Sequence, residues 1–447
     1  MCWQLNGQQR ILLVTTFVLF CHLANGQSVE LPDDAWAQPA VYWDGLIDEP
    51  VIPAAWSSAP LLDANRPLSD FRSDQFDGDS GFNLANSFNA FPEFEGGISI
   101  VNDKVAMKIG GYVKADLIKD FDAISSTDEF DTTSIFTDGS LSRNARFHAR
   151  QSRLSFDTRW HVNERVVRAY IEGDFFSGDD NGTSNFRLRH AYGTLGRLTA
   201  GQTWTTFVDP SAVPPTLDFE GAVSNVNRRQ GLVRYEQPIM DDRLTFAVAI
   251  EDPEFIFTQP EMVSGKDQTQ SPDFLTRLRL EDDWGSFQVA LVLRQLGFQV
   301  SDGPLIEELA WGFNFSGSAR LLERTKGYCQ ITFGEGIGSY RGSPDAVATG
   351  PNTAAILPVF GWMVGVHHEW TDQLTSNVTF SKLTLEDQPG QSPANLADTT
   401  YLAVNLIANP YERVFCGIEY LYGIRQDVSG QSGSANRLQI SFGFYLP

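Results

Sequence analysis

Between Arg143 and Glu236 the chain reads SRLSFDTRW at residues 152–160, RVVRAYIEGDFF at 165–176, NFRLRHAYGTLG at 185–196 and NRRQGLVRYEQ at 227–237. In each segment apolar residues alternate with polar ones, and many of the polar positions hold arginine. A period of two residues predicts β-strands, each with one apolar face and one charged face. These strands are expected to form part of the wall of an outer-membrane barrel.

The alternation assigns side chains to the two faces of this wall. Facing lipid we expect Leu154, Phe156, Thr158, Trp160, Val167, Ala169, Ile171, Phe186 and Leu188. Facing the lumen we expect Arg153, Ser155, Asp157, Arg159, Arg168, Tyr170, Glu172, Asp174, Arg187 and Arg189. The strict period then places His190 on the outer row.

Similar alternating segments of about ten residues continue to the C-terminus, separated by Gly, Asp, Asn or Pro clusters, as is typical of transmembrane β-barrels. The segments are 106–122, 147–160, 164–176, 184–195, 197–204, 228–237, 242–251, 272–281, 285–297, 308–320, 326–334, 359–371, 373–386, 397–408, 411–424 and 435–446. They number about sixteen, an even count in the range of porins, whose lumen is open to water. The fold class is therefore all-β, a transmembrane antiparallel β-barrel.

Short and long connections between these segments also alternate. Tight connections are expected at positions such as Gly196 and Asn409–Pro410, and long polar ones at 121–141 and 339–358. Periplasmic turns and extracellular loops differ in this way.

The N-terminal region has a different character. Arg10 precedes an apolar run at 11–20, and small residues at 24–26 offer a cleavage point, which indicates a signal peptide at 1–26. Residues 27–95 show no regular period and are expected to form an irregular periplasmic arm, with the barrel at 96–447. Since no other run approaches 18 apolar residues, only a closed barrel could cross a membrane.

Charge is unevenly distributed along the chain. The net charge is −23, which disfavours nucleic acid as a partner. The stretch 143–234 nevertheless holds 13 arginines, no lysine and 9 acidic residues, a balance of +4 that leaves −27 for the remainder. Because arginine stays charged and its planar fork suits carboxylates, a row of arginines in a pore favours anions. The alternative is that every arginine is paired with a carboxylate, which leaves no selectivity.

The insertion at 203–227 is too long for an ordinary turn. We expect it to fold inward as a constriction loop that includes Trp204, with Asp209, Asp218 and Glu220 facing the arginines across the bore. Alternatively, the loop caps the outer mouth or reaches a neighbouring subunit.

Several motifs resemble those of the DcaP-like outer-membrane porin family. They are FPEFEGGISIVNDKVAMKIGGYVKADLIKDFD at 91–122, RQSRLSFDTRW at 150–160, RLRHAYGTLGRLTAGQTWTTFVDP at 187–210 and RRQGLVRYEQP at 228–238. The resemblance covers roughly residues 90 to 250 clearly, and the rest matches in strand pattern and length. It departs from the family in lacking a heptad pattern at 28–95 and in ending at Pro447 rather than at an aromatic residue.

The resemblance implies a trimeric, 16-stranded porin in the outer-membrane lipid that favours small anionic solutes, dicarboxylates among them. No cofactor, metal site or enzymatic activity is expected, since catalytic motifs such as G-x-S-x-G are absent from the sequence. The arginines expected along the solute pathway are Arg146, Arg150, Arg153, Arg159, Arg168, Arg187, Arg189, Arg228, Arg229 and Arg234.

Two other classes of function stay open at this point. An outer-membrane barrel enzyme such as a hydrolase would show activity in detergent. A soluble, secreted β-rich binding protein would partition away from membranes.

Overall fold

The computed structural model describes residues 98–101, 105–162, 165–178, 184–240, 243–258, 265–300, 304–350, 353–389 and 391–446. The expected signal peptide at 1–26 and the expected arm at 27–95 lie outside the described residues. Within the described ranges, no helix is long and apolar enough to cross a membrane.

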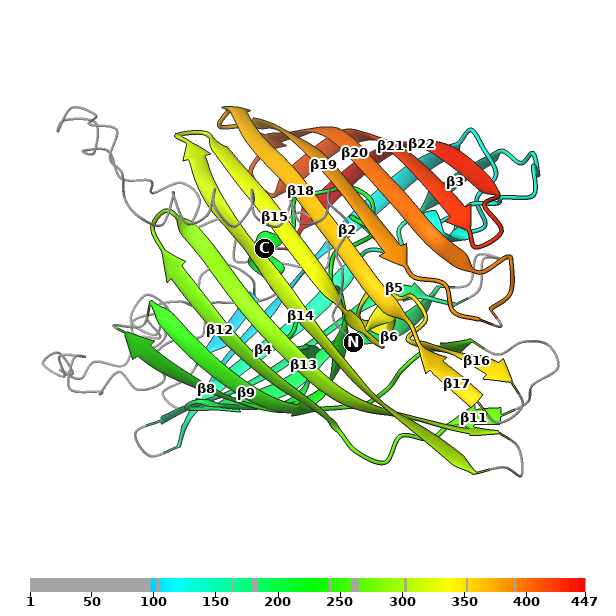
Figure 1. Cartoon of the computed structure of the whole chain (residues 1–447). Coiled ribbons are helices and arrows are strands. Elements are labelled where there is room, and N and C mark those ends of the chain that lie inside the picture. The colour runs from blue at the N-terminus through cyan, green and yellow to red at the C-terminus, as the bar shows by residue number, and fades with distance from the viewer. Residues whose placement is uncertain are drawn as a thin grey trace, which may run out of the picture. The chain divides into compact units, whose positions relative to one another are not determined.

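Sixteen long antiparallel strands form a closed barrel (Figure 1). They are β2 (Val105–Asp120), β4 (Arg153–Val162), β5 (Arg165–Ser177), β6 (Asn185–Leu195), β7 (Leu198–Trp204), β8 (Arg229–Met240), β9 (Leu244–Glu251), β12 (Asp273–Asp282), β13 (Gly285–Val300), β14 (Leu305–Leu322), β15 (Thr325–Glu335), β18 (Pro358–Thr371), β19 (Leu374–Leu385), β20 (Leu396–Tyr411), β21 (Val414–Asp427) and β22 (Ser432–Tyr445). The barrel closes where β2 pairs with β22, from Tyr112 opposite Tyr445 to Asp120 opposite Arg437.

Short strands complete the ladder where a long neighbour ends. β1 (Ile98–Val101) pairs with the start of β2, β3 (Asn144–His148) with its end, and β11 (Gly265–Asp267) with the end of β13. Outside the barrel sheet, β10 (Phe257–Thr258), β16 (Ala346–Gly350) and β17 (Thr353–Ile356) form a small sheet of their own. The short 3-10 helices are η3 (Thr132–Ser134), η4 (Pro210–Ala212) and η5 (Gly338–Arg341).

The barrel and its sixteen strands are confirmed, with local differences. The segment expected at 147–160 is two strands, because a turn closed by the Ser152 N–H donating to the Ala149 carbonyl oxygen separates β3 from β4. The turn expected at Asn409–Pro410 lies at Glu412–Arg413 instead, where Arg413 adopts a left-handed φ of 62°.

The prediction that His190 lies on the outer row is wrong. The ladder between β5 and β6 pairs Glu172 with His190 but Gly173 with Leu188, so Arg189 is an extra, bulged residue. A β-bulge shifts the side-chain alternation by one residue. His190 therefore points inward, where its ring is fully buried and its Nδ1 lies 3.0 Å from Thr203 Oγ1.

Three long loops contribute residues to a large apolar cluster inside the barrel. We name them L1 (121–143, between β2 and β3), L3 (205–228, between β7 and β8) and L6 (336–357, between β15 and β18). Phe207 and Val223 of L3 and Tyr340 of L6 belong to this buried cluster, together with inward residues such as Met363 of β18. Apolar burial thus fixes the loops against the inner wall.

Gly111 lets β2 bend where its neighbour changes. The neighbour on one side of β2 is β1 up to Ile109 and β22 from Tyr112 onward. Gly111 lies between them with a φ of +131°, and a Cβ there would be 2.1 Å from the Arg153 carbonyl oxygen. Only glycine fits this backbone position.

We therefore expect Gly111→Ala to destabilise the barrel by at least about 2 kcal/mol, because the substitution adds both backbone strain and a clash with backbone. The measurement is the unfolding midpoint in urea of the detergent-folded protein. Gly231→Ala is the matched control, since a Cβ on that β8 glycine meets nothing within 4 Å. Equal midpoints for the two variants would contradict this role of Gly111.

Candidate functional site

Strands β4, β5 and β6 carry arginines on their inward rows. Arg153, Arg159 and Arg189 are buried, and Arg168 and Arg187 are partly exposed. Their neighbours in sequence, such as Leu154, Phe156 and Ile171, are exposed on the outer face. The alternation expected for these strands thus agrees with the side-chain positions.

Each carboxylate of this wall contacts more than one arginine. Glu172 Oε1 lies 2.7 Å from Arg189 Nε and 3.4 Å from Arg153 Nε. Asp174 Oδ2 lies 2.9 Å from Arg187 Nη2 and 2.9 Å from Arg189 Nη1.

Asp157 is shared in the same way. Its Oδ2 lies 3.1 Å from Arg159 Nη2 and 2.8 Å from Arg168 Nη2. Across the wall of β4 to β6, five paired arginines meet three carboxylates, which leaves a net charge of +2. Within this group of residues, the arginines outnumber the carboxylates that hold them in place.

Arg146 and Arg150 are held at the L1 end of this wall. Arg146 Nε lies 2.6 Å from Asp128 Oδ1, and Arg150 Nη1 contacts the other oxygen of the same carboxylate. Here too one carboxylate of a loop serves two arginines.

The remaining candidate arginines lie on β8 and just before it. Arg228 Nη2 is 3.3 Å from Glu254 Oε2, and Arg234 Nε is 3.6 Å from Glu236 Oε1. Arg229 lies 4.4 Å from the centre of the Trp204 ring, a cation–π distance. Among the described residues, Arg229 forms no ion pair.

L3 folds into the barrel and follows the inner faces of the strands on the other side. The carbonyl oxygens of Val208 and Phe207 accept hydrogen bonds from Gln288 of β13 and Asn314 of β14. Further along, Val226 N–H donates to Gln330 of β15 and Val223 N–H to Ser381 of β19.

The tip of L3 reaches the strands at the barrel closure. Glu419 of β21 accepts hydrogen bonds from the N–H groups of Leu217 (3.0 Å) and Asp218 (2.7 Å). The Leu217 carbonyl oxygen accepts from Lys114 of β2 and Gln439 of β22. L3 thus lies along the inner wall from β13 round to β2, and its Phe219 ring also stacks on Phe176 of β5, with 3.9 Å between the ring centres.

Glycines on the inward row of β18 make room for L3. A Cβ on Gly365 would be 2.3 Å from Pro214 Cγ, and one on Gly361 would be 2.9 Å from Ser224 Cβ. Larger residues at these two positions would push L3 away from the wall.

The carboxylates of L3 do not face the arginines of β4 to β6, which corrects the expectation for Asp209, Asp218 and Glu220. Asp209 Oδ1 lies 2.7 Å from Arg279 Nη1 of β12, and Glu220 Oε1 lies 2.7 Å from Arg341 Nη1 of L6. Asp218 is fully buried 3.8 Å from Arg437 Nη1. The physical reason is that these charges, once desolvated, need partners on the surfaces against which L3 packs.

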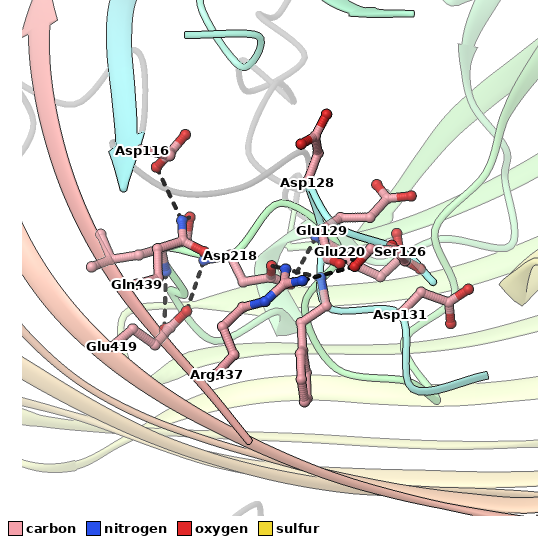
Figure 2. A network of polar contacts seen from close by, with 12 residues as sticks. Asp116, Ser126, Asp128, Glu129, Asp131, Asp218, Glu220, Glu419, Arg437 and Gln439 are labelled. Atoms are coloured by element: carbon pink, nitrogen blue, oxygen red, sulfur yellow. Dashed lines mark hydrogen bonds and ion pairs between the residues drawn. The ribbon is translucent and has the colours of Figure 1, made fainter. Parts of the chain in front are cut away.

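L1 meets L3 at a group of polar side chains (Figure 2). Asp218 Oδ1 accepts a hydrogen bond of 2.8 Å from the Phe130 N–H of L1, and Arg437 Nη2 donates to the Ser126 carbonyl oxygen at 2.7 Å. Figure 2 also places Glu129 and Asp131 of L1 beside Glu220. Carboxylates from two loops are thereby concentrated at one place.

Crowding of these carboxylates changes their acidity. Burial, reinforced by the charges of Glu220, Asp218 and Asp131, raises the pKa of Glu129 well above its usual range. Burial and the charge of Glu220 likewise raise the pKa of Asp131, and burial raises that of Asp218. Acidification from neutral pH therefore removes negative charge where L1 meets L3.

Sequence reasoning missed the residues that anchor L3, namely Lys114, Glu419, Gly361, Gly365 and Arg437. Lys114 belongs to the GGYVK motif, and the alternation of side chains along β2 is the signal that could have placed it inside the barrel, where it is buried. Nothing in the sequence pairs Glu419 with Leu217, because the contact joins segments about 200 residues apart.

The comparison with protein families matches residues 74–445 to the model described as DcaP outer membrane protein. Among solved structures, the outer membrane channel DcaP of Acinetobacter baumannii is similar at 20% identity, with a TM-score of 0.71 over 78% of this chain and 99% of that chain. The comparison with curated proteins finds no match.

Two further structures share the fold at a greater distance. An anion-selective porin from Comamonas acidovorans is 11% identical, with a TM-score of 0.52 over 77% of this chain and 100% of that chain. A trimer form of OmpT from Vibrio cholerae is 12% identical, with a TM-score of 0.50 over 77% and 100%. At these identities the likeness concerns the fold alone.

We expect Glu419→Ala to loosen the tip of L3 while the barrel still folds. A hydrogen bond contributes about 0.5–1.5 kcal/mol and this variant removes two, so amide hydrogen exchange at 217–218 should become about tenfold faster. Exchange is read by mass spectrometry in detergent. Glu412→Ala, at an exposed turn, is the control. Unchanged exchange in the Glu419 variant would mean that other contacts hold the tip.

Proposed function

Because the chain belongs to the DcaP outer membrane protein family, we propose that this outer-membrane porin passes small anionic solutes, dicarboxylates among them, by passive diffusion. The solutes move between L3 and the arginines of β4 to β6 and β8. The observation that carries the proposal is the sharing of Asp157, Glu172 and Asp174 by five arginines, which leaves positive charge on the inner wall.

Arg187 is the arginine of this wall best placed to meet a solute. About a third of its side chain is exposed (34%), although its Nε and Nη2 donate hydrogen bonds to the two oxygens of the buried Asp174. Its guanidinium also lies 5.2 Å from the centre of the Phe219 ring of L3. Arg187 thus stands where L3 and the wall approach each other, with charge still available to an anion.

The proposal extends to processing and assembly. Residues 1–26 act as a signal peptide, 27–95 as a periplasmic arm and L3 as the constriction of the channel. The chain assembles as a homotrimer in outer-membrane lipid, a proposal supported by the family and by the trimer form of the OmpT relative in fold. As a passive channel it needs no cofactor and is not an enzyme.

Flux through liposomes tests the proposal. Vesicles that contain the protein should swell faster in a small dicarboxylate than in a neutral solute of the same size. Arg187→Gln should slow the dicarboxylate about threefold, because a unit charge about 6 Å away in water contributes about 0.7 kcal/mol.

The matched control for that variant is Arg425→Gln. Arg425 is also an inward, partly exposed arginine in an ion pair, at 2.8 Å from Asp427, but it lies on β21, away from the arginine wall. It should leave the flux ratio of dicarboxylate to neutral solute nearly unchanged. Equal effects of both variants, or no preference for the dicarboxylate, would contradict the proposed pathway.

Anion preference should also increase on acidification. The raised pKa values of Glu129, Asp131 and Asp218 mean that these groups take up protons as the pH falls, so anions meet less repulsion. The ratio of chloride to potassium permeability is measured in bilayers at about pH 7.5 and about pH 5. Glu129→Gln should reduce the pH dependence, and a wild-type ratio that falls with acidification would contradict this assignment.

A further inference from the structure

The outer face of the barrel carries a groove next to its closure, at the L1 end of β2. Its volume is about 430 Å³, and its lining includes Leu117 and Lys119 of β2, Ala145 and Phe147 of β3, and Leu438 and Ile440 of β22. This volume is in the range of sites that hold small organic ligands.

The groove results from a small residue between larger ones. Lys119 lies opposite Ala145 on β3 and opposite Leu438 on β22. The methyl group of Ala145 leaves space above the sheet, and Phe147, which is 71% exposed, borders it. The lining is therefore mostly apolar and includes two cationic residues, Lys119 and Arg146, of which Arg146 is bound to Asp128.

Lys119 lies at the boundary between apolar and polar outer surface. On β22 the outward residues below this level are Ile440, Phe442 and Phe444. Above it, Asn436 donates a hydrogen bond of 2.8 Å to Asp122 of L1. Because long loops mark the extracellular side of such barrels, this boundary faces the outer leaflet of the membrane.

Among the described residues, Lys119 forms no ion pair. The neighbouring Asp120 points inward and binds Arg437 at 2.6 Å, and the outward positions of β3 and β22 around the groove hold no carboxylate. The carboxylate of Asp122 of L1, on this outer surface, accepts hydrogen bonds from Asn436.

We propose that the groove binds a phosphorylated, acylated glycolipid of the outer leaflet. An acyl chain lies between Leu117, Phe147 and Leu438, and Lys119 pairs with a phosphate of the headgroup. Cationic side chains at a membrane boundary recognise anionic headgroups, and apolar burial of the chain adds affinity. This site is on the outside of the barrel and does not depend on the proposed channel function.

Native mass spectrometry of the detergent-folded, full-length mature protein tests the site. The probes are diphosphorylated lipid A, the same lipid without phosphates, and inorganic phosphate alone. Lys119→Gln should weaken binding of the diphosphorylated lipid about fivefold, the contribution of one cation near an anionic headgroup. Binding of the phosphate-free lipid should stay unchanged in that variant, and inorganic phosphate alone should bind neither protein.

A second variant tests the contribution of the apolar groove to lipid binding, apart from the contribution of the Lys119 charge. Ala145→Leu fills the groove and should weaken both lipids alike. The control is Arg165→Gln, which removes an exposed outward cation at the opposite end of the strands. All variants are first checked for folding by their channel conductance.

Either of two results would overturn the proposal. One is equal binding of diphosphorylated lipid A to the wild type, Lys119→Gln and Ala145→Leu. The other is a disulfide between copies of Ala145→Cys that forms in membranes and excludes lipid, which would assign the groove to a second copy of the chain.

Discussion

The inner wall of this barrel depends on carboxylates that each hold more than one arginine. A buried guanidinium without a partner would be costly, and a wall with one carboxylate for every arginine would be neutral. Sharing Asp157, Glu172 and Asp174 among five arginines meets both constraints. The arginines are fixed in position, and the five guanidinium groups still outnumber the three carboxylates.

L3 is held on the inner wall by hydrogen bonds to strands other than β4, β5 and β6. Backbone groups of L3 form hydrogen bonds with side chains on β13, β14, β15 and β19. At the barrel closure, the tip of L3 forms hydrogen bonds with Glu419, Lys114 and Gln439. Two carboxylates of L3 form ion pairs: Asp209 pairs with Arg279, and Glu220 pairs with Arg341. These two carboxylates are therefore paired with arginines outside the wall of β4 to β6.

The alternation of side chains made the barrel predictable from sequence, down to the inward positions of Arg153, Arg159 and Arg168. A strict period could not locate the bulge at Arg189, because one extra residue in a strand leaves no mark in composition and yet turns His190 inward. Nor could it pair Asp218 with Arg437 or Leu217 with Glu419, since such contacts depend on how a long loop packs in three dimensions. The alternation along a strand predicts which side chains face the inside of the barrel, whereas the contacts between loops and strands depend on tertiary packing.

The zero-current potential across a planar bilayer that contains the purified wild-type protein, under a gradient of potassium chloride, tests the role of the arginine wall most directly. A potential whose sign reports chloride preference is the expected result, despite the net charge of −23. A potential that reports potassium preference would mean that the acidic remainder, and not the arginines of β4 to β6, controls the channel.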